Sequence, residues 1–214
     1  MPTLYTYVMP YDGGSAPNPY WGICTLVICK PKIRLSAQVG DWVVGTGSTR
    51  ARVTDREFRD MSGRVVYAMR VTDKMTMQEY DALTRERLPN KIPDWFNRDW
   101  RRRVGDSIYD FTTIPPKQRK SVHDVRAVER DLGGGYALLS TDFYYFGDQA
   151  VALAGDLLPI LAKTQGHRSN VNGPYLDGFV AWVRGLGHAP GSLLGDPIFR
   201  RLRGKAAGGE MPNP

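Results

Sequence analysis

A seven-residue run without a charged side chain, ICTLVIC at 23–29, places the strongest limit on how this chain folds. Its apolar residues occupy both odd and even positions, which is typical of a strand buried on both faces. A loop rich in Gly, Pro and Asn precedes the run at 12–22, and Pro31 follows it. Because proline cannot donate to a strand ladder, we expect a central strand that ends at Pro31.

Other strands are predicted from β-branched and aromatic residues, some of them alternating with polar ones. They lie at 3–11, 42–46, 63–76 and 136–147. Thr76 opens a T-M-Q-E capping box, which predicts a helix directly after it. Helical spacing predicts a helix at 175–187 and a helical region at 150–168 that is loosened near Gly155 and interrupted at Pro159.

The order of these elements predicts the fold class. Strands come first and helices last, without regular alternation, which indicates an α+β fold. We expect a mostly antiparallel, barrel-like sheet with helices packed to one side. The segment 89–121 carries four prolines and fits no period, which favours a functional or mobile region.

Length and charge narrow the class of protein. The 214 residues predict a single domain at 1–202 and a disordered tail at 203–214. The net charge of +7 suits a polyanionic partner such as DNA or a nucleotide, or an anionic membrane surface, and the alternative is a merely basic soluble protein. No apolar run approaches the ~18 residues of a membrane span. No secretory signal is visible either, so we expect a cytoplasmic protein with no membrane partner.

The two cysteines, Cys24 and Cys29, both fall in the apolar run. A C-x4-C pair with scattered histidines is not a zinc pattern, so no metal and no cofactor are expected. Side chains five apart on a strand face opposite sides, which argues against a disulfide between them. Either both thiols are core residues, or one is a nucleophile. Lys30 beside Cys29 can lower a thiol pKa, whereas Cys24 lies nearer the loop and is slightly favoured.

Several polar residues could act beside a thiol. Asp41 follows Gly40 and is either a turn residue or a general base. His123 is either structural or a proton carrier. In QGHR, His167 and Arg168 suit a phosphate or a base edge. Asp142 precedes four aromatic residues, an arrangement that can stack and read a base but is also common in cores.

A cluster of arginines follows in the irregular segment. Arg98, Arg101, Arg102 and Arg103 lie between aromatic residues, as in a patch that contacts a nucleic-acid backbone. The simpler interpretation is a solvated basic surface.

Taken in order, DGGSAPNPYWGICTLVICKPKIR, GDWVVGTGS, GDSIY, FYYFG and GHR resemble the second of the nucleotide-modification-associated domain families. The resemblance covers roughly 5 to 190, with Ser107 where the family pattern has Asn. It implies a bacterial or phage protein linked to modified bases in DNA, with other base-modification proteins as further partners. The motif positions it carries over are Asp12, Asn18, Cys24, Cys29, Lys30, Arg34, Asp41, Asp106, Tyr145, His167 and Arg168.

Two functions follow from these residues and the resemblance. The first is an enzyme that acts on a modified base, with Cys24 or Cys29 as nucleophile and Asp41 or His123 moving protons. Its specific form is thiol-mediated hydration of a nitrile on a 7-deazaguanine. Asn18 and Tyr145 would grip the base, and Arg34 and Arg168 the phosphates. The second function is a non-catalytic reader that holds a modified base in an aromatic pocket. A free nucleotide could replace DNA as the substrate.

Overall fold

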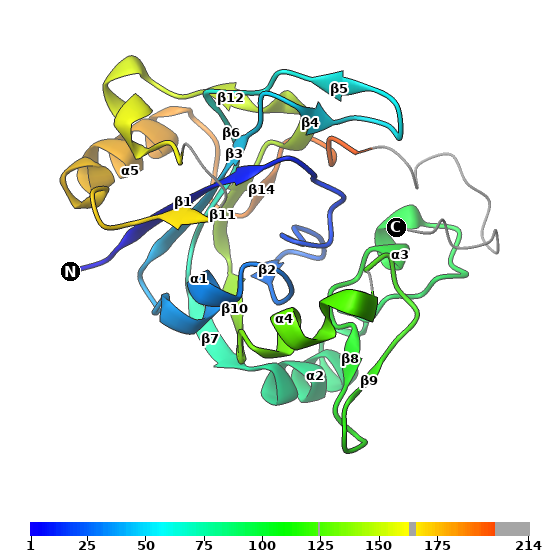
Figure 1. Cartoon of the computed structure of the whole chain (residues 1–214). Coiled ribbons are helices and arrows are strands. Elements are labelled where there is room, and N and C mark those ends of the chain that lie inside the picture. Colours follow the sequence, from blue (N-terminus) through cyan, green and yellow to red (C-terminus); the bar gives the residue numbers. More distant parts are fainter. Residues whose placement is uncertain (124, 163–165, 200–214) are drawn as a thin grey trace.

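The largest element of the computed structural model, which describes residues 1–123, 125–162 and 166–199, is a seven-stranded sheet (Figure 1). Its strands are β1 (Leu4–Met9), β3 (Trp42–Gly47), β6 (Arg64–Arg70), β11 (Asp142–Tyr145), β12 (Val151–Ala152), β13 (His167–Arg168) and β14 (Ser192–Leu193). The main path runs β13-β1-β3-β6-β11-β14, and β12 pairs with β6. Only β1–β3 and β11–β14 pair in parallel. Among the described strands the path ends at β13 and β14, so the sheet does not close into a barrel.

A smaller antiparallel sheet lies beside the large one. It consists of β2 (Cys24–Leu26), β10 (Tyr136–Ser140) and β7 (Asp73–Thr76), in the order β2-β10-β7. Only Thr141 separates β10 from β11, so one continuous segment of chain connects the two sheets. Two short hairpins complete the strands: β4 (Ala51–Arg52) with β5 (Phe58–Arg59), and β8 (Tyr109–Asp110) with β9 (Lys117–Gln118).

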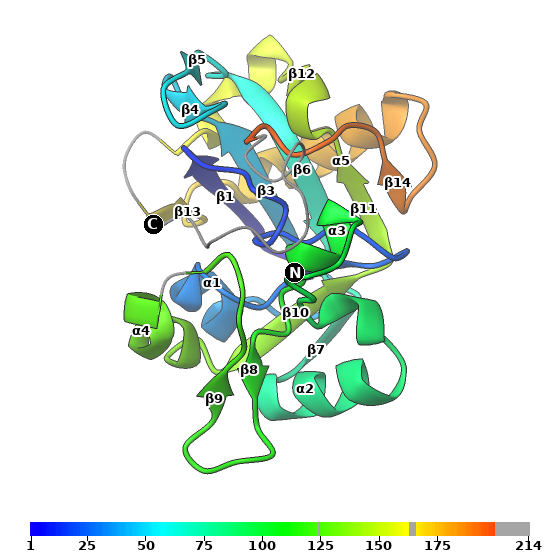
Figure 2. The same ribbon diagram turned by 90° about the vertical axis from the view of Figure 1, so that its right-hand side faces the viewer.

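The helices pack on different layers (Figures 1 and 2). On one face of the large sheet, α5 (Leu176–Gly185) and η4 (Gly155–Ile160) bury a cluster that includes Trp42 and Phe179. On the other face, α1 (Pro31–Ser36) and β2 pack against Tyr67 and its neighbours. The remaining helices are α2 (Met77–Glu86), η1 (Pro89–Lys91), α3 (Trp100–Arg103), η2 (Val125–Ala127), α4 (Val128–Leu132), η3 (Gly147–Gln149) and η5 (Gly173–Tyr175). The helices therefore cover both faces of the large sheet and not one side of it.

The α+β class and the mostly antiparallel pairing are confirmed. Helix α2 begins after Thr76, whose hydroxyl accepts from Glu79 N while the Glu79 carboxylate accepts from Thr76 N. Helix α5 lies within the predicted region 175–187. The predicted strands 63–76 and 136–147 are each two strands, because the chain passes from the large sheet to the small one after β6 and from the small sheet to the large one after β10.

The prediction for 23–29 is wrong in its second half. Strand β2 ends at Leu26, and Pro31 begins α1 instead of ending a strand. Cys29 and Lys30 have φ angles of 58° and 44°, in the left-handed region that breaks an extended chain. Proline is well tolerated in the first turn of a helix because its missing N–H would have no partner there. The prediction that Cys24 and Cys29 face opposite sides of one strand therefore does not hold, because Cys29 lies outside the strand.

The helix predicted over 150–168 is also wrong. The described part of this segment holds β12, the 3-10 helix η4 and β13. Pro159 lacks the N–H that an α-helix needs, and Gly155 weakens helix formation further. The tail predicted at 203–214 lies outside the described residues. Among the helices that are described, none is long and apolar enough to cross a membrane.

Candidate active site

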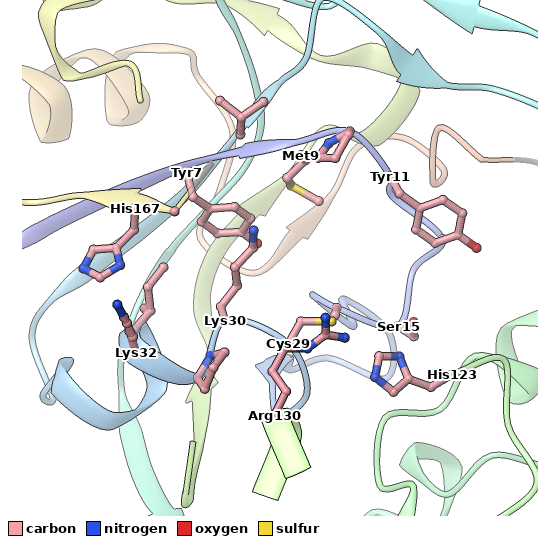
Figure 3. A pocket seen from close by; sticks show the side chains of 17 residues that line it. Tyr7, Met9, Tyr11, Ser15, Cys29, Lys30, Lys32, His123, Arg130 and His167 are labelled. Carbon is pink, nitrogen blue, oxygen red and sulfur yellow. The ribbon is translucent and has the colours of Figure 1, made fainter. Parts of the chain in front are cut away.

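A cavity of about 610 Å³ opens between β1 and the turn that precedes α1 (Figure 3). Its wall includes Tyr7, Met9, Tyr11, Ser15, Cys29, Lys30, Lys32, His123, Arg130 and His167. These residues come from β1 and the loop after it, the α1 turn, the segment before η2, α4 and β13. Five separate stretches of chain thus line one cavity.

The turn that carries Cys29 is strained. The backbone N–H and the backbone carbonyl of Cys29 each have a side-chain hydrogen-bond partner. A carboxylate oxygen of Asp131, Oδ1, accepts from Cys29 N at 2.8 Å. The guanidinium of Arg34 donates from Nε to Cys29 O at 2.8 Å. Non-glycine residues in the left-handed region persist only where their surroundings fix them, and such strain is common at functional sites. These contacts direct the Cys29 side chain toward the cavity.

Cys29, His123 and Asp131 form a thiol–imidazole–carboxylate cluster. One ligand atom from each residue, a sulfur, an imidazole nitrogen and a carboxylate oxygen, lies within 4.8 Å of the other two. His123 Nε2 lies 2.6 Å from Asp131 Oδ2, which also accepts from the Tyr109 hydroxyl at 3.1 Å. Figure 3 shows the imidazole of His123 and the thiol of Cys29 on the same side of the cavity. One imidazole nitrogen is thus in ion-pair contact with a buried carboxylate, without the geometry of a hydrogen bond, which places a third group beside a candidate base.

The electrostatics of the cluster favour an ionised Asp131 and a neutral Cys29. Burial alone would raise the pKa of Asp131, but contacts from His123, Cys29 N and Tyr109 lower it below its ordinary value. Burial first, and Asp131 second, raise the pKa of Cys29 against the opposing effect of nearby cations. A thiol of this kind is protonated near neutral pH and needs a base to become a nucleophile. His123 is placed to be that base.

The same three side chains are also a possible metal-ligand set. Thiolate, imidazole and carboxylate are the groups that bind Zn²⁺, and three ligands with an open position are typical of catalytic zinc. In such a site the sulfur would be a ligand and not a nucleophile. An experiment can distinguish a cluster that supplies a nucleophile from a cluster that binds a metal.

The charged groups on the cavity wall are all basic. Lys30, Lys32 and Arg130 line it, and the described lining residues include no carboxylate. Lys30 Nζ lies 4.2 Å from the Tyr7 ring centroid, and burial lowers the pKa of this lysine. Burial, followed by the charges of Lys32 and Lys30, also lowers the pKa of His167. A wall of this composition attracts an anion, because a bound anion relieves the repulsion among the cations.

Cys24, the other predicted nucleophile, lies in the core between the two sheets. Its side chain is fully buried and does not line the cavity. Burial raises its pKa to about 12, with Lys91 as the main opposing charge. The two thiols are both free, but only Cys29 reaches the cavity.

Several motif residues form a buried polar network away from the cavity. Asp106 accepts from the hydroxyls of Thr25 and Tyr80 at 2.5 and 2.7 Å. Asn18 accepts from Lys91 Nζ at 2.7 Å, and its amide donates to the Val104 carbonyl. These contacts join the N-terminal loop to the 89–108 segment, so the network has a structural explanation.

Asp12, Asp41 and Asp142 also have structural partners. Asp12 accepts from the Tyr145 hydroxyl at 2.7 and 2.8 Å. Asp41 accepts from Thr3 N and Gln38 N. Asp142 pairs with Arg184 at 2.6 Å. The aromatic rings of 143–146 are buried in the core, so they offer no open pocket for a base.

The arginine cluster is dispersed over different environments. Arg98 and Arg101 are exposed, Arg102 contacts Asn90, and Arg103 is buried. None of the four lines this cavity or a larger one beside it, whereas Arg168 lines the larger one. Their predicted contact with a nucleic-acid backbone stays a prediction.

Arg34 is fully buried and does not reach the cavity. Besides Cys29 O, its guanidinium donates to the backbone carbonyls of Asp131 and Tyr136. Burial lowers its pKa to about 10, which leaves it charged at neutral pH. Arg34 therefore positions the Cys29 turn against α4.

Sequence reasoning missed Asp131 together with the lining residues Tyr7, Tyr11, Lys32 and Arg130. Asp131 lies 102 positions from Cys29, with which it hydrogen-bonds. It follows His123 by eight positions, in VERDLGG, and no spacing rule connects the two. The only available signal was a carboxylate shortly after a candidate histidine.

Comparison with protein families decides where the chain belongs. The profile of a family described as nucleotide modification associated domain 2 matches residues 1–203. The chain belongs to this family. Nucleotide modification associated domain 2 therefore includes the Cys29 turn, His123, Asp131 and the whole cavity wall. Neither the curated proteins nor the solved structures that were compared with the chain match it.

Proposed function

We propose that this chain is a thiol-dependent enzyme that acts on a modified nucleotide base. The observation that carries the proposal is the Cys29–His123–Asp131 cluster, of which Cys29 and His123 lie on the wall of a basic cavity. The family description supplies the link to nucleotide modification. The cations on the wall suit the phosphate of a nucleotide, and the exposed ring of Tyr11 suits its base.

In this proposal each residue of the cluster has one role. Cys29 Sγ attacks an electrophilic carbon of the base, and His123 takes the thiol proton. Asp131 holds the imidazole and stabilises its charged form, as the third group does in other nucleophile–base pairs. Arg34 is a positioning residue, because it fixes the strained turn without touching the cavity.

The specific reaction we propose is hydration of a nitrile on a 7-deazaguanine. The thiolate forms an S–C bond to the nitrile carbon, and the nitrile nitrogen takes the proton from His123 to give a thioimidate. Water then adds to that carbon, the C–S bond breaks, and the thiol regains its proton. The net change is the addition of one water, which leaves a carboxamide. Thiols add readily to nitrile carbons, and the two steps return the enzyme unchanged.

Substitution of the two cysteines tests the proposal with a matched pair. Cys29→Ala is expected to reduce turnover of nitrile-bearing DNA at least about a hundredfold, because it removes the nucleophile. Cys24→Ala should keep near-normal turnover once folding is verified, since Cys24 does not reach the cavity. Mass spectrometry of the nucleosides measures the conversion. Full activity in Cys29→Ala would contradict covalent catalysis.

Metal analysis separates the nucleophile from a zinc ligand. We expect the purified protein to retain turnover after dialysis against a strong chelator. Stoichiometric zinc whose removal abolishes turnover would instead assign the cluster to metal binding. The reader alternative predicts tight binding of modified DNA with the nucleosides unchanged.

A further inference from the structure

A second cavity of about 1130 Å³ adjoins the first along β1. The two cavities share Val8, Pro10, Lys30 and Gly166 on their walls. A ligand can therefore extend from one cavity into the other past the Lys30 side chain. The second cavity is larger than a single phosphate group requires, since cavities of ~300–1,000 Å³ hold whole drug-sized ligands.

The second wall is rich in small and hydroxyl-bearing residues. It includes Thr46, Gly47, Ser48, Thr49, Ser62 and Gly63. Hydroxyl groups and exposed backbone N–H groups are common donors to phosphate oxygens in nucleic-acid complexes. This part of the wall comes from the end of β3 and the start of β6, which the sheet holds in place.

The charges of this second wall are again only positive. Lys30 and Arg168 are its charged residues, and no carboxylate occurs among the described lining residues. Arg168 Nε is buried and has no hydrogen-bond partner within the described parts of the chain. Its backbone is fixed by pairing with Thr6 on β1 and by a 3.0 Å bond from Asn172 Nδ2 to Arg168 O. A buried, unpaired guanidinium nitrogen points to an anionic partner.

We propose that the second cavity binds the phosphodiester and the neighbouring nucleotide of a strand whose modified base occupies the first. The inference rests on the proposed function and names its substrate class: a polynucleotide and not a free nucleotide. Arg168 contacts the linking phosphate, and Lys30 lies where the strand passes between the cavities. The first cavity alone would suffice for a mononucleotide.

The test compares two ligands that carry the same base. One is 7-cyano-7-deaza-2′-deoxyguanosine 5′-monophosphate, and the other is a single-stranded tetranucleotide that contains this base once. Dissociation constants are measured on the full chain at physiological ionic strength, for wild type, Arg168→Gln and Arg168→Lys. Arg87→Gln is the control, because Arg87 is exposed at the C-cap of α2, where it pairs with Glu86, and it lines neither cavity. Protection of Cys29 from alkylation reports occupancy of the first cavity.

The tetranucleotide should bind wild type at least about tenfold tighter than the mononucleotide. Arg168→Gln should remove about tenfold of tetranucleotide affinity and leave mononucleotide affinity within about twofold. Arg168→Lys should retain part of the gain, and Arg87→Gln all of it. Thermal unfolding of each variant checks that the fold is intact.

Other outcomes overturn the inference in distinguishable ways. If the mononucleotide protects Cys29 but the tetranucleotide binds no tighter, the substrate is a free nucleotide and only this inference fails. If Arg168→Gln weakens both ligands equally, Arg168 serves the first cavity and the inference again fails. If neither ligand protects Cys29, the proposed function fails together with it.

Discussion

Lys91 is a fully buried cation whose role can be understood from its immediate contacts. Its Nζ lies within 3.0 Å of four oxygens, which belong to Asn18, Ile23 and Thr25. Burial lowers its pKa to about 8, against the opposing charge of Asp106. Burial in turn raises the pKa of Asp106, although Lys91 opposes this shift. The ammonium thus fixes the loop that leads to β2, and through β2 the Cys29 turn.

Replacing Lys91 by methionine should therefore destabilise the protein strongly. The change leaves Asp106 as a buried charge and several oxygens without a donor, which typically costs about 3–5 kcal/mol. Chemical denaturation measures the free energy of unfolding. Lys117→Met is the control, because Lys117 is exposed and its loss should change stability by less than about 0.5 kcal/mol. Equal stabilities for the two variants would show that the network is dispensable.

At the scale of elements, the site depends on how α4 meets the turn before α1. Asp131 on α4 accepts from Cys29 N with one oxygen and contacts His123 with the other. Arg34 on α1 donates to the Asp131 carbonyl. One carboxylate therefore connects the Cys29 turn, His123 and α4, so that a shift of α4 would separate the three side chains of the cluster.

The free energy of unfolding should decrease in acid, because Asp131 becomes protonated there. Asp131→Asn should remove this contribution to the pH dependence. The pKa of Asp131 is lower in the folded protein, so its carboxylate stabilises the fold above the ordinary pKa of about 3.9. That stability is lost as the pH falls through the lower folded value. Between about pH 6 and pH 3 the wild type should lose more unfolding free energy than Asp131→Asn. Denaturant titrations at several pH values measure the difference, and parallel curves would refute it.

The same elements show what could be predicted from the sequence. Helix α2 was predictable because its capping box satisfies terminal N–H groups locally. The turn at Cys29 and Lys30 was not, because ICTLVIC favours a strand by local preference. Contacts from Asp131 and Arg34, distant in sequence, hold these two residues in the left-handed region. His123 was a candidate from the sequence, whereas its carboxylate partner required the tertiary structure.

At the scale of the whole molecule, some of the cations behind the net charge of +7 lie together in the structure. Lys30, Lys32, Arg130 and Arg168 surround two adjoining cavities whose described walls carry no carboxylate. These four cations therefore lie where we propose that a strand binds. The buried networks around Lys91 and Asp12 lie elsewhere and support the fold.

Binding of a single-stranded oligonucleotide should fall steeply with salt. Each phosphate neutralised on a single strand contributes about −0.7 to the slope of log K against log salt concentration. Lys32→Gln should reduce the magnitude of that slope by about 0.7, because Lys32 is exposed on the cavity wall. Lys117→Gln, on an exposed hairpin strand, should leave the slope unchanged. Fluorescence anisotropy across a salt series measures both slopes, and identical slopes for the two variants would place the strand elsewhere.

The most direct test of the central claim is the detection of a covalent bond between Cys29 and the modified base. Nitrile-bearing DNA is mixed with the full chain, the reaction is stopped in acid, and the peptides are mapped by mass spectrometry. The account predicts a transient base adduct on the peptide that contains Cys29, absent in Cys29→Ser and retained in Cys24→Ala. An adduct on Cys24, or turnover by a chain that never carries an adduct on Cys29, would contradict it.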